Sequence, residues 1–306
     1  MVNLIETHQL AVYGEKVRLY VDHSLSENSR KAYRTDFEHF IGWGGSVPST
    51  PEMVAAYLSD HAESLSMATL QRRLVSIGKA NNVAGFSNPA QSILVKTTFK
   101  GIRRLHAKPQ RQVQPILKED IIMMLSKLTD TTQGKRDAAL IMLAFCGAFR
   151  RSELSQIRCD DVRFAAEGLV VRLQRSKTDQ LGEGRDIAIP SGNGRVCPVR
   201  AVQAWMEAIC SEGFLFRPVL KGGSISSEKL SSNAIAQVIK RLAKSVGYDP
   251  TEYSGHSTRS GFATSAAQAG KSSWNIRRQT GHKSDQMLNR YIRQGNLFKD
   301  NAAALF

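Results

Sequence analysis

Apolar residues in the first hundred positions recur at spacings of three and four, which is the pattern of helices with one buried face. Ser26 or Asn28 is placed to cap a helix whose apolar positions run from Ala32 to Ile41, and the glycines at 42–45 end it. Because no strand-like alternation occurs in this half, we predict an all-α bundle. Further helices are predicted at residues 9–21, 51–63, from Ser66 through Ile77, and at 89–105.

The stretch from His106 to Pro115 is polar, carries two prolines and lacks periodic apolar positions, as is typical of a linker. Beyond it, residues 168–173 and 185–189 have the composition of two strands, joined by a polar loop at 174–184. The second half is therefore predicted to be a helical domain that contains a small antiparallel sheet. The predicted boundaries are 1–107 for the first domain, 108–115 for the linker and 116–306 for the second domain. Its helices are predicted at 118–128, 135–146, 199–210, 231–246, 257–269, 273–279 and 284–292.

Length and charge narrow the class of partner. A chain of 306 residues is long enough for two domains that each bury a core. The net charge of +15 is spread over both halves: residues 1–113 hold 14 basic and 9 acidic side chains, and residues 114–306 hold 28 and 18. A surplus of this size on two folded segments favours a nucleic-acid partner over a role in solubility alone.

The cysteines and the N-terminus give no sign of secretion or of a membrane anchor. The four cysteines form neither a CxxC pair nor a Cys/His cluster with zinc spacing, so we predict neither a disulfide framework nor a metal site. The longest apolar run, 138–149, is too short to span a bilayer, and no basic segment leads into an apolar run at the N-terminus. We expect a soluble, cytoplasmic protein without a membrane partner.

Candidate chemistry is concentrated in the second half. Arg150 ends an apolar run, and Glu153 is placed three residues on to brace it, although this pair alone is more typical of a structural salt bridge. His256 and Arg259 lie three apart on a predicted first turn of a helix, so both project to one side. A phosphate or another anion between the two side chains would offset the cost of placing a histidine beside an arginine. The start of an ordinary surface helix can show the same spacing.

A second set of polar residues follows in the last 30 positions. His282 lies between Gly281, which ends one predicted helix, and Ser284, which is placed to cap the next. Tyr291 is on that next helix, and nine helical residues at 100° each would put the two side chains on opposite faces, so the turn is needed for them to converge. A turn histidine and a packing aromatic are the plain alternatives. Lys177 is in the loop between the two strands, where a lysine is ordinarily solvated charge.

The ordered set of six residues resembles the active-site signature of the tyrosine recombinases, the class of phage integrases and Cre-like enzymes. Its members are Arg150, Lys177, His256, Arg259, His282 and Tyr291. The resemblance covers the linker and the whole second domain, and residues 29–43, 69–76 and 88–104 are similar to that family's helical core-binding domain. Residues 146–149 read Cys-Gly-Ala-Phe where Thr-Gly-Leu is frequent, and Asn81 stands where histidine is frequent. Neither departure touches a catalytic position.

The resemblance implies a mainly α fold, with an all-α, SAM-like core-binding bundle followed by an α+β catalytic domain of the DNA breaking-rejoining class. It also implies a site-specific recombinase that cleaves and rejoins DNA strands through a 3′-phosphotyrosyl intermediate. Such an enzyme exchanges strands between two duplex sites and uses no ATP, metal or other cofactor.

The roles of the six residues are implied in the same way. Arg150 and Arg259 would hold the scissile phosphate, and His282 would add a hydrogen bond to it. Tyr291 would attack the phosphorus while His256 assists the loss of its proton. The remaining roles fall to Lys177, which would protonate the leaving 5′-oxygen, and to Glu153, which would brace Arg150.

The implied partner is a double-stranded recombination site, bound by a homotetramer on two DNA sites, with the protein monomeric or weakly associated without DNA and located at the nucleoid. The apolar tail at 302–306 is predicted to dock on a neighbouring protomer, with folding back onto its own domain as the alternative. Basic residues of the first domain are predicted DNA contacts: Arg30, Lys31, Arg34, Arg72, Arg73, Arg103 and Arg104. The target sequence, the biological role and the accessory proteins are not predicted.

Three other functions stay open at this point. A type IB topoisomerase would use nearly the same residues, although the compact helical first domain and the apolar tail favour recombination. A non-catalytic DNA-binding relative would have lost the chemistry, which the presence of all six polar positions disfavours. A metal-dependent transposase or nuclease would need a carboxylate cluster, and the sequence offers no convincing set.

Overall fold

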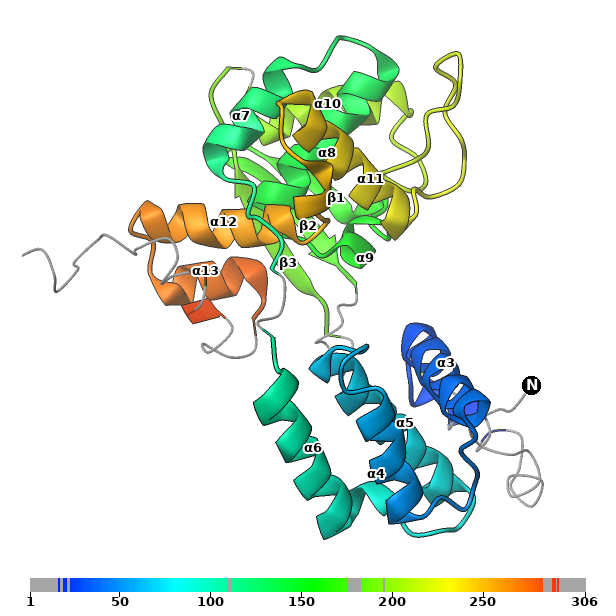
Figure 1. Ribbon diagram of the computed structural model, residues 1–306. Coiled ribbons are helices and arrows are strands. Elements are labelled where there is room, and N and C mark those ends of the chain that lie inside the picture. The colour runs from blue at the N-terminus through cyan, green and yellow to red at the C-terminus, as the bar shows by residue number, and fades with distance from the viewer. Residues whose placement is uncertain are drawn as a thin grey trace, which may run out of the picture. The chain divides into compact units, whose positions relative to one another are not determined.

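The computed structural model describes residues 16, 19–20, 23–108, 112–174, 183–194, 196–282, 288–289 and 291. The chain divides into two compact units, residues 1–111 and 112–306, and each has its own hydrophobic core. The predicted fold class is confirmed: the described elements are mostly helices, with one small antiparallel sheet (Figure 1). Among the described helices, none combines the length and the apolar character needed to cross a bilayer.

The first unit is built from helices whose first turns are capped by side chains. The Oγ atoms of Ser26 and Ser66 accept hydrogen bonds from backbone N–H groups three residues on, and Gly44 ends the first helix in a left-handed conformation with φ 111°. The predicted helix from residue 89 is wrong at its start, because Pro89 opens only one 3₁₀ turn and Ser92 caps the α-helix that follows. The elements are α3 (Glu27–Trp43), α4 (Pro51–Asp60), α5 (Met67–Val83), η1 (Pro89–Gln91) and α6 (Ile93–His106).

The apolar faces of these helices meet in one core. Phe40, Tyr57, Leu70 and Ile77 are completely buried there, and Val95 joins them from α6. Burial of large side chains at about 25 cal/mol per Å² is the main term that stabilises a bundle of this size. The helical periodicity of the sequence therefore predicts the core of this unit well.

A buried polar cluster ties α3 to α4 and α5. Asp36, 1 % exposed, accepts two hydrogen bonds from Arg72, at 2.6 Å and 2.8 Å. Arg73 is 8 % exposed, and its guanidinium donates to the Tyr57 hydroxyl at 2.8 Å while its Nε lies 3.7 Å from Asp36. The structure gives no support to the prediction of Arg73 as a DNA contact, because its charge is buried and used inside the unit.

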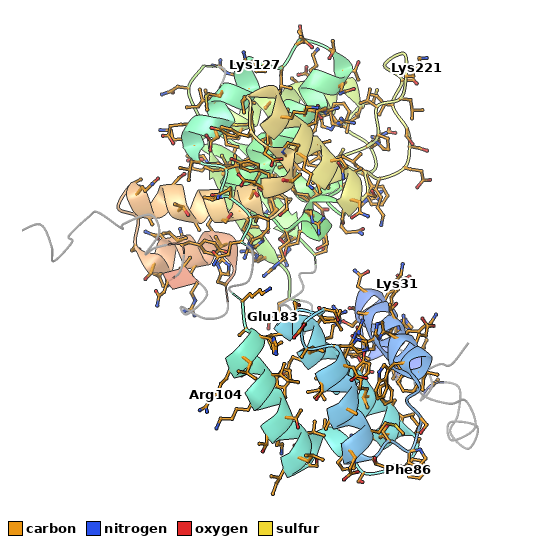
Figure 2. The ribbon with its side chains drawn as sticks, in the orientation of Figure 1. Lys31, Phe86, Arg104, Lys127, Glu183 and Lys221 are labelled. Atoms are coloured by element: carbon orange, nitrogen blue, oxygen red, sulfur yellow. The ribbon has the colours of Figure 1, made fainter. Side chains whose placement is uncertain are left out.

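The other basic residues proposed as DNA contacts reach solvent in varying degree. Lys31 on α3 and Arg104 on α6 extend from their helices into solvent (Figure 2). Arg72 is half-exposed but is held by Asp36, which neutralises part of its charge. The remaining candidates are Arg30, which is half-buried, and the exposed Arg34 and Arg103.

At the centre of the second unit lies a helix whose middle part is buried on all sides. Residues 139–144 of α8 are all at most 2 % exposed, because α7, α10 and α12 pack around them. The elements of this unit are α7 (Lys118–Ser126), α8 (Thr132–Cys146), α9 (Arg151–Leu154), η2 (Cys159–Asp161), β1 (Val162–Ala165), β2 (Gly168–Leu173), β3 (Arg185–Pro190), α10 (Pro198–Ala208), α11 (Ser232–Ser245), η3 (Pro250–Glu252), α12 (Ser257–Gln268) and α13 (Ser273–Thr280).

The sheet has one strand more than the sequence predicts. Its order is β1-β2-β3 with antiparallel pairing throughout, and Val171 lies opposite Val162 on one side and Ile187 on the other. Only Val162 of β1 is buried, so this short strand lacks the alternation that marks β2 and β3. β1 is a strand because it pairs with β2, and this pairing is a tertiary contact that the local pattern of β1 does not reveal.

Candidate active site

Arg150 stands where the central buried helix has ended and the short α9 begins. It caps α9 with extended backbone, and its own N–H donates to Glu153 Oε2 at 2.8 Å. Its guanidinium donates to Glu153 Oε1 at 2.6 Å, and the exposed fractions of the two side chains are 22 % and 3 %. The predicted brace is therefore present in the structure, and it leaves part of the guanidinium open to solvent.

Arg259 approaches the same place from the first turn of α12. It is 1 % exposed, and its Nη1 donates to the carbonyl oxygen of Ala148 at 2.6 Å. Ala148 has φ 48°, a left-handed conformation that is strained for a residue other than glycine. Ala148 lies two positions before Arg150, and its carbonyl oxygen holds Arg259 in place. The turn after α8 therefore brings the two arginines together.

His256 and Tyr291 are in direct contact. His256 is the N-cap residue of α12, and its Nε2 lies 2.9 Å from the Tyr291 hydroxyl, while the Tyr291 side chain is half-buried. His282 is also close to the tyrosine, with ring centroids 6.1 Å apart. Tyr291 thus contacts one histidine at the start of α12 and lies beside another just after the end of α13.

Gly281 makes this turn possible. It ends α13 in a left-handed conformation with φ 66°, as the sequence predicts. Any other residue would be strained by this φ, and its Cβ, 2.9 Å from the guanidinium carbon of Arg185, would force that side chain to shift. His282 follows, 6 % exposed, with Nδ1 2.7 Å from the Thr280 hydroxyl oxygen.

Arg185, the first residue of β3, belongs to the site but is not among the residues that the sequence predicts for it. Its Nη1 donates to the carbonyl oxygens of Arg278 and Gln279, both at 3.2 Å, and so holds the C-terminal end of α13 against the sheet. It also interacts electrostatically with Arg150 and Glu153. The one signal in the sequence is an arginine at the start of a strand that is otherwise apolar at alternate positions.

The site carries more positive charge than its acids can balance. Glu153 is the one buried carboxylate that interacts with the arginines at 150, 185 and 259 in the described part of the chain. The Nη2 atoms of Arg185 and Arg259 are buried and have no hydrogen-bond partner among the described residues. Buried donors without partners are costly, so this arrangement favours an anion between the guanidinium groups.

The same charges set the protonation of the histidines. Burial and then the charges of Arg259 and Arg150 lower the pKa of His282 to about 4. Desolvation and then the same two arginines lower the pKa of His256, although the residue keeps an exposed edge. Burial and then Arg150 lower the pKa of Arg259 to about 10, which leaves it charged at pH 7. Both histidines are therefore neutral at pH 7, and His256 can accept the phenol proton of Tyr291.

The structure thus brings together five of the six predicted residues and the brace. Lys177 lies outside the described residues, as do Ser284 and the tail at 302–306. The described site can hold an anion, present a phenol beside it and accept the phenol proton. These are the requirements of nucleophilic attack on a phosphodiester.

Comparisons with known proteins agree with this chemistry. Residues 115–296 match the model of the phage integrase family. Over 299 residues the chain is 40% identical to an integrase/recombinase of Selenomonas ruminantium described as a XerD homologue, a match that covers 94% of this chain and 87% of the relative. It is 25% identical to the Cre recombinase of Escherichia phage P1, over 80% of this chain and 76% of Cre. A lambda integrase tetramer bound to a Holliday junction has a similar fold, with TM-score 0.63 and 17% identity over 96% of this chain and 77% of that one.

Proposed function

The chain belongs to the phage integrase family and is a site-specific tyrosine recombinase, and from this membership we propose how its residues cleave and rejoin DNA. The observation that carries the proposal is the Tyr291 hydroxyl at 2.9 Å from His256 Nε2, in a site where the buried Nη2 atoms of Arg185 and Arg259 have no partner among the described residues. Arg150 and Arg259 bind the non-bridging oxygens of the scissile phosphate, and His282 donates a further hydrogen bond to it.

The reaction is a transesterification that conserves the energy of the broken bond. The Tyr291 oxygen attacks phosphorus while its proton passes to His256, and the bond from phosphorus to the 5′-oxygen breaks. Lys177 gives a proton to that leaving oxygen. The product is a 3′-phosphotyrosyl link, which a 5′-hydroxyl from a partner duplex attacks in the reverse sense to join the exchanged strands. Neither ATP nor metal enters this balance.

A nicked suicide substrate tests the proposal. The fragment beyond the nick diffuses away after cleavage, so wild-type protein accumulates a covalent adduct that survives a denaturing gel. The same assay run with a chelator tests the absence of a metal. A two-site substrate separates strand exchange from the relaxation that a topoisomerase would give. Cleavage without recombinant products on two sites, but with relaxation of supercoils, would contradict the recombinase assignment.

We propose that both units grip the duplex, with the first unit as the core-binding domain at residues 1–107 and the second as the catalytic domain. The exposed Lys31, Arg34, Arg103 and Arg104, together with Arg30, are the proposed phosphate contacts of the first unit. If about ten phosphates are contacted in all, the logarithm of affinity falls with the logarithm of salt concentration at a slope near −9. A flat salt dependence would exclude this mode of binding.

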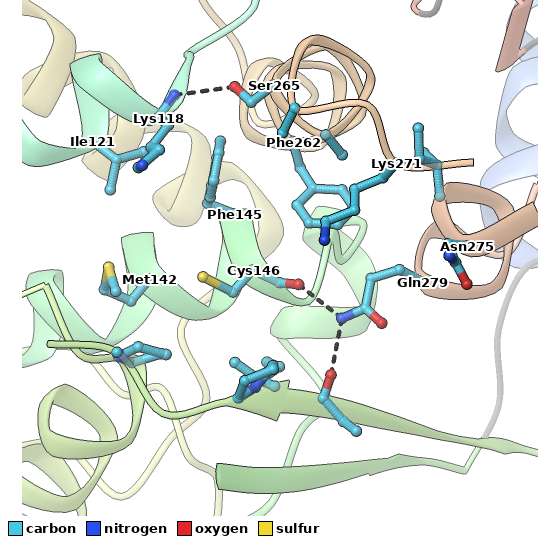
Figure 3. Close-up of a pocket in the computed structure, with 18 of the residues that line it drawn as sticks. Lys118, Ile121, Met142, Phe145, Cys146, Phe262, Ser265, Lys271, Asn275 and Gln279 are labelled. Atoms are coloured by element: carbon cyan, nitrogen blue, oxygen red, sulfur yellow. Dashed lines mark hydrogen bonds between the residues drawn. The ribbon is translucent and has the colours of Figure 1, made fainter. Parts of the chain in front are cut away.

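An apolar cavity in the second unit supports assembly into a tetramer. The cavity has a volume of about 1000 Å³, and Ile121, Met142, Phe145 and Phe262 line it (Figure 3). The five proposed catalytic residues that the structure describes do not line it. We propose that it receives the tail at 302–306 of a neighbouring protomer, by resemblance to the family. Replacing Leu305 and Phe306 by alanine should then abolish assembly on two sites while leaving binding to a single site intact.

A further inference from the structure

Thr280, the last residue of α13, is completely buried against the ring of His282. Its Oγ1 lies 2.8 Å from the carbonyl oxygen of Ile276, one helical turn earlier, and 2.7 Å from Nδ1 of His282. A carbonyl only accepts hydrogen bonds, and a hydroxyl carries a single proton. The carbonyl oxygen of Arg277, at 3.4 Å, is a second and more distant helical acceptor, so the threonine can donate either into the helix or to Nδ1 but not to both.

The two possible arrangements differ by one hydrogen bond. If the hydroxyl donates to Ile276, Nδ1–H of His282 donates to the hydroxyl oxygen, and both contacts are hydrogen bonds. If the hydroxyl donates instead to Nδ1, the contact with the Ile276 carbonyl contains no proton. Because these groups are buried, the arrangement with two hydrogen bonds is the more stable one. It places the proton of the neutral ring on Nδ1 and leaves a lone pair on Nε2.

The charges around the ring favour the same tautomer. The groups that act electrostatically on His282 are Arg259 and His256 from α12, Arg150 from the start of α9, and Arg185 from β3, and the ring of Tyr291 lies beside it with centroids 6.1 Å apart. Three of them are cations with N–H donors, which attract a nitrogen lone pair and repel an N–H group. Burial, together with these cations, keeps the ring neutral by lowering the pKa of His282 to about 4.

We propose that Thr280 is a positioning residue that holds His282 as the Nδ1–H tautomer, so that His282 takes up one proton from solvent at Nε2 when the scissile phosphate binds. This inference rests on the proposed function, because it takes His282 as a ligand of the phosphate. A phosphate oxygen is an acceptor, so Nε2 has to carry a proton before it can donate there. The charge of the bound phosphate offsets the cations that keep the ring neutral, and this links protonation to DNA binding.

Nitrogen NMR of histidine-labelled protein reads the tautomer directly in the free enzyme. The signal of His282 is assigned by its loss in a His282→Gln variant. We expect a protonated Nδ1 and an unprotonated Nε2 in the wild type. In Thr280→Val, which keeps the side-chain shape but removes the hydroxyl, the proton should move to Nε2. In Thr280→Ser, which keeps the hydroxyl, the wild-type pattern should persist. Detection of Nε2–H in the free wild-type enzyme would overturn the proposal.

Calorimetry of DNA binding measures the proton. Binding of an uncleaved site by a Tyr291→Phe variant is measured at pH 7 in two buffers of different ionisation enthalpy, which gives the number of protons taken up. With Thr280 intact we expect an uptake approaching one proton per bound protomer. With Thr280→Val the neutral ring already donates from Nε2, so the uptake should fall towards zero. The Thr280→Ser variant should restore it.

Thr264→Val provides the matched control. Thr264 is equally buried, on α12, and its hydroxyl has no partner among the described residues, so the same substitution there should leave both the tautomer and the proton uptake unchanged. Equal uptake by wild type and Thr280→Val would reject the proposal. If instead the wild type shows the expected tautomer but forms no adduct on a suicide substrate, the proposed function fails and the role of Thr280 in the free enzyme stands.

Discussion

Each unit of this protein contains a histidine hydrogen-bonded to a tyrosine, with arginine close by, and we propose a chemical role for only one of these pairs. In the first unit, His39 Nδ1 lies 3.0 Å from the Tyr57 hydroxyl, and Arg73 donates to that hydroxyl at 2.8 Å. In the second unit, His256 Nε2 lies 2.9 Å from the Tyr291 hydroxyl. The distances alone do not distinguish a structural pair from a catalytic one.

The difference lies in access and in the balance of charge. Tyr57 is completely buried, and Asp36 offsets the positive charges of Arg72 and Arg73. Burial raises the pKa of Tyr57 against the opposing effect of Arg73, so the phenol keeps its proton. Tyr291 is half-buried. Among the described residues, Glu153 is the one buried carboxylate that interacts with the arginines of this site. A surplus of cations beside an accessible phenol is therefore what makes the second site suited to a phosphodiester.

Replacing each tyrosine by phenylalanine should show the largest difference between the two pairs. Tyr291→Phe should form no covalent adduct on a nicked suicide substrate, because the attacking oxygen is gone. Tyr57→Phe should form the adduct at the wild-type level when DNA is saturating, and should lower the stability of the first unit by about 1–3 kcal/mol because Arg73 loses a partner. An adduct formed by Tyr291→Phe would place the nucleophile elsewhere.

Removing one guanidinium from the site should have the next largest effect. Arg150→Ala should lower the rate of cleavage by about 10² to 10³ while DNA binding is largely retained, because the lost donor acts mainly in the transition state. The substitution also removes the guanidinium that pairs with Glu153 Oε1, although the backbone N–H of residue 150 still donates to Oε2, so folding has to be separated from chemistry. In Arg150→Ala/Glu153→Gln the buried charge is gone, and the rate should stay low although stability recovers. A rate near that of the wild type in either variant would contradict the role of Arg150.

The low pKa of His282 predicts a dependence of stability on acid. Its pKa of about 4 in the folded protein lies below the ordinary value of 6.5, so the unfolded chain binds a proton in that window and the folded protein does not. Stability should therefore fall as the pH drops from about 6.5 to 4, by up to about 3 kcal/mol from this group. Denaturant unfolding at pH 7 and pH 4.5 should show a smaller fall in His282→Gln than in the wild type. The same fall in both proteins would argue against this assignment.

Local patterns predict the elements that carry the site, and tertiary contacts decide the rest. The Arg150–Glu153 brace and the Gly281 terminator follow from spacings of a few residues, so the sequence predicts both. Arg73 and Arg185 are different, because burial against Asp36 in one case and contact with the end of α13 in the other depend on partners distant in the chain. The pairing that creates β1 is of the same kind.

The smallest effect is expected at Ala148, where the strained turn holds Arg259 in place. Glycine adopts φ 48° without the steric cost that Ala148 bears, although it also gains freedom in the unfolded chain, so Ala148→Gly should stabilise the second unit by about 1 kcal/mol or less. Ala263→Gly, in a helical and equally buried position, should destabilise it by about 1 kcal/mol or more. If the carbonyl of residue 148 still accepts from Arg259, cleavage by Ala148→Gly stays near the wild-type rate. A stabilised variant that cleaves slowly would mean instead that the stiffness of this turn, and not only its shape, keeps the guanidinium aligned.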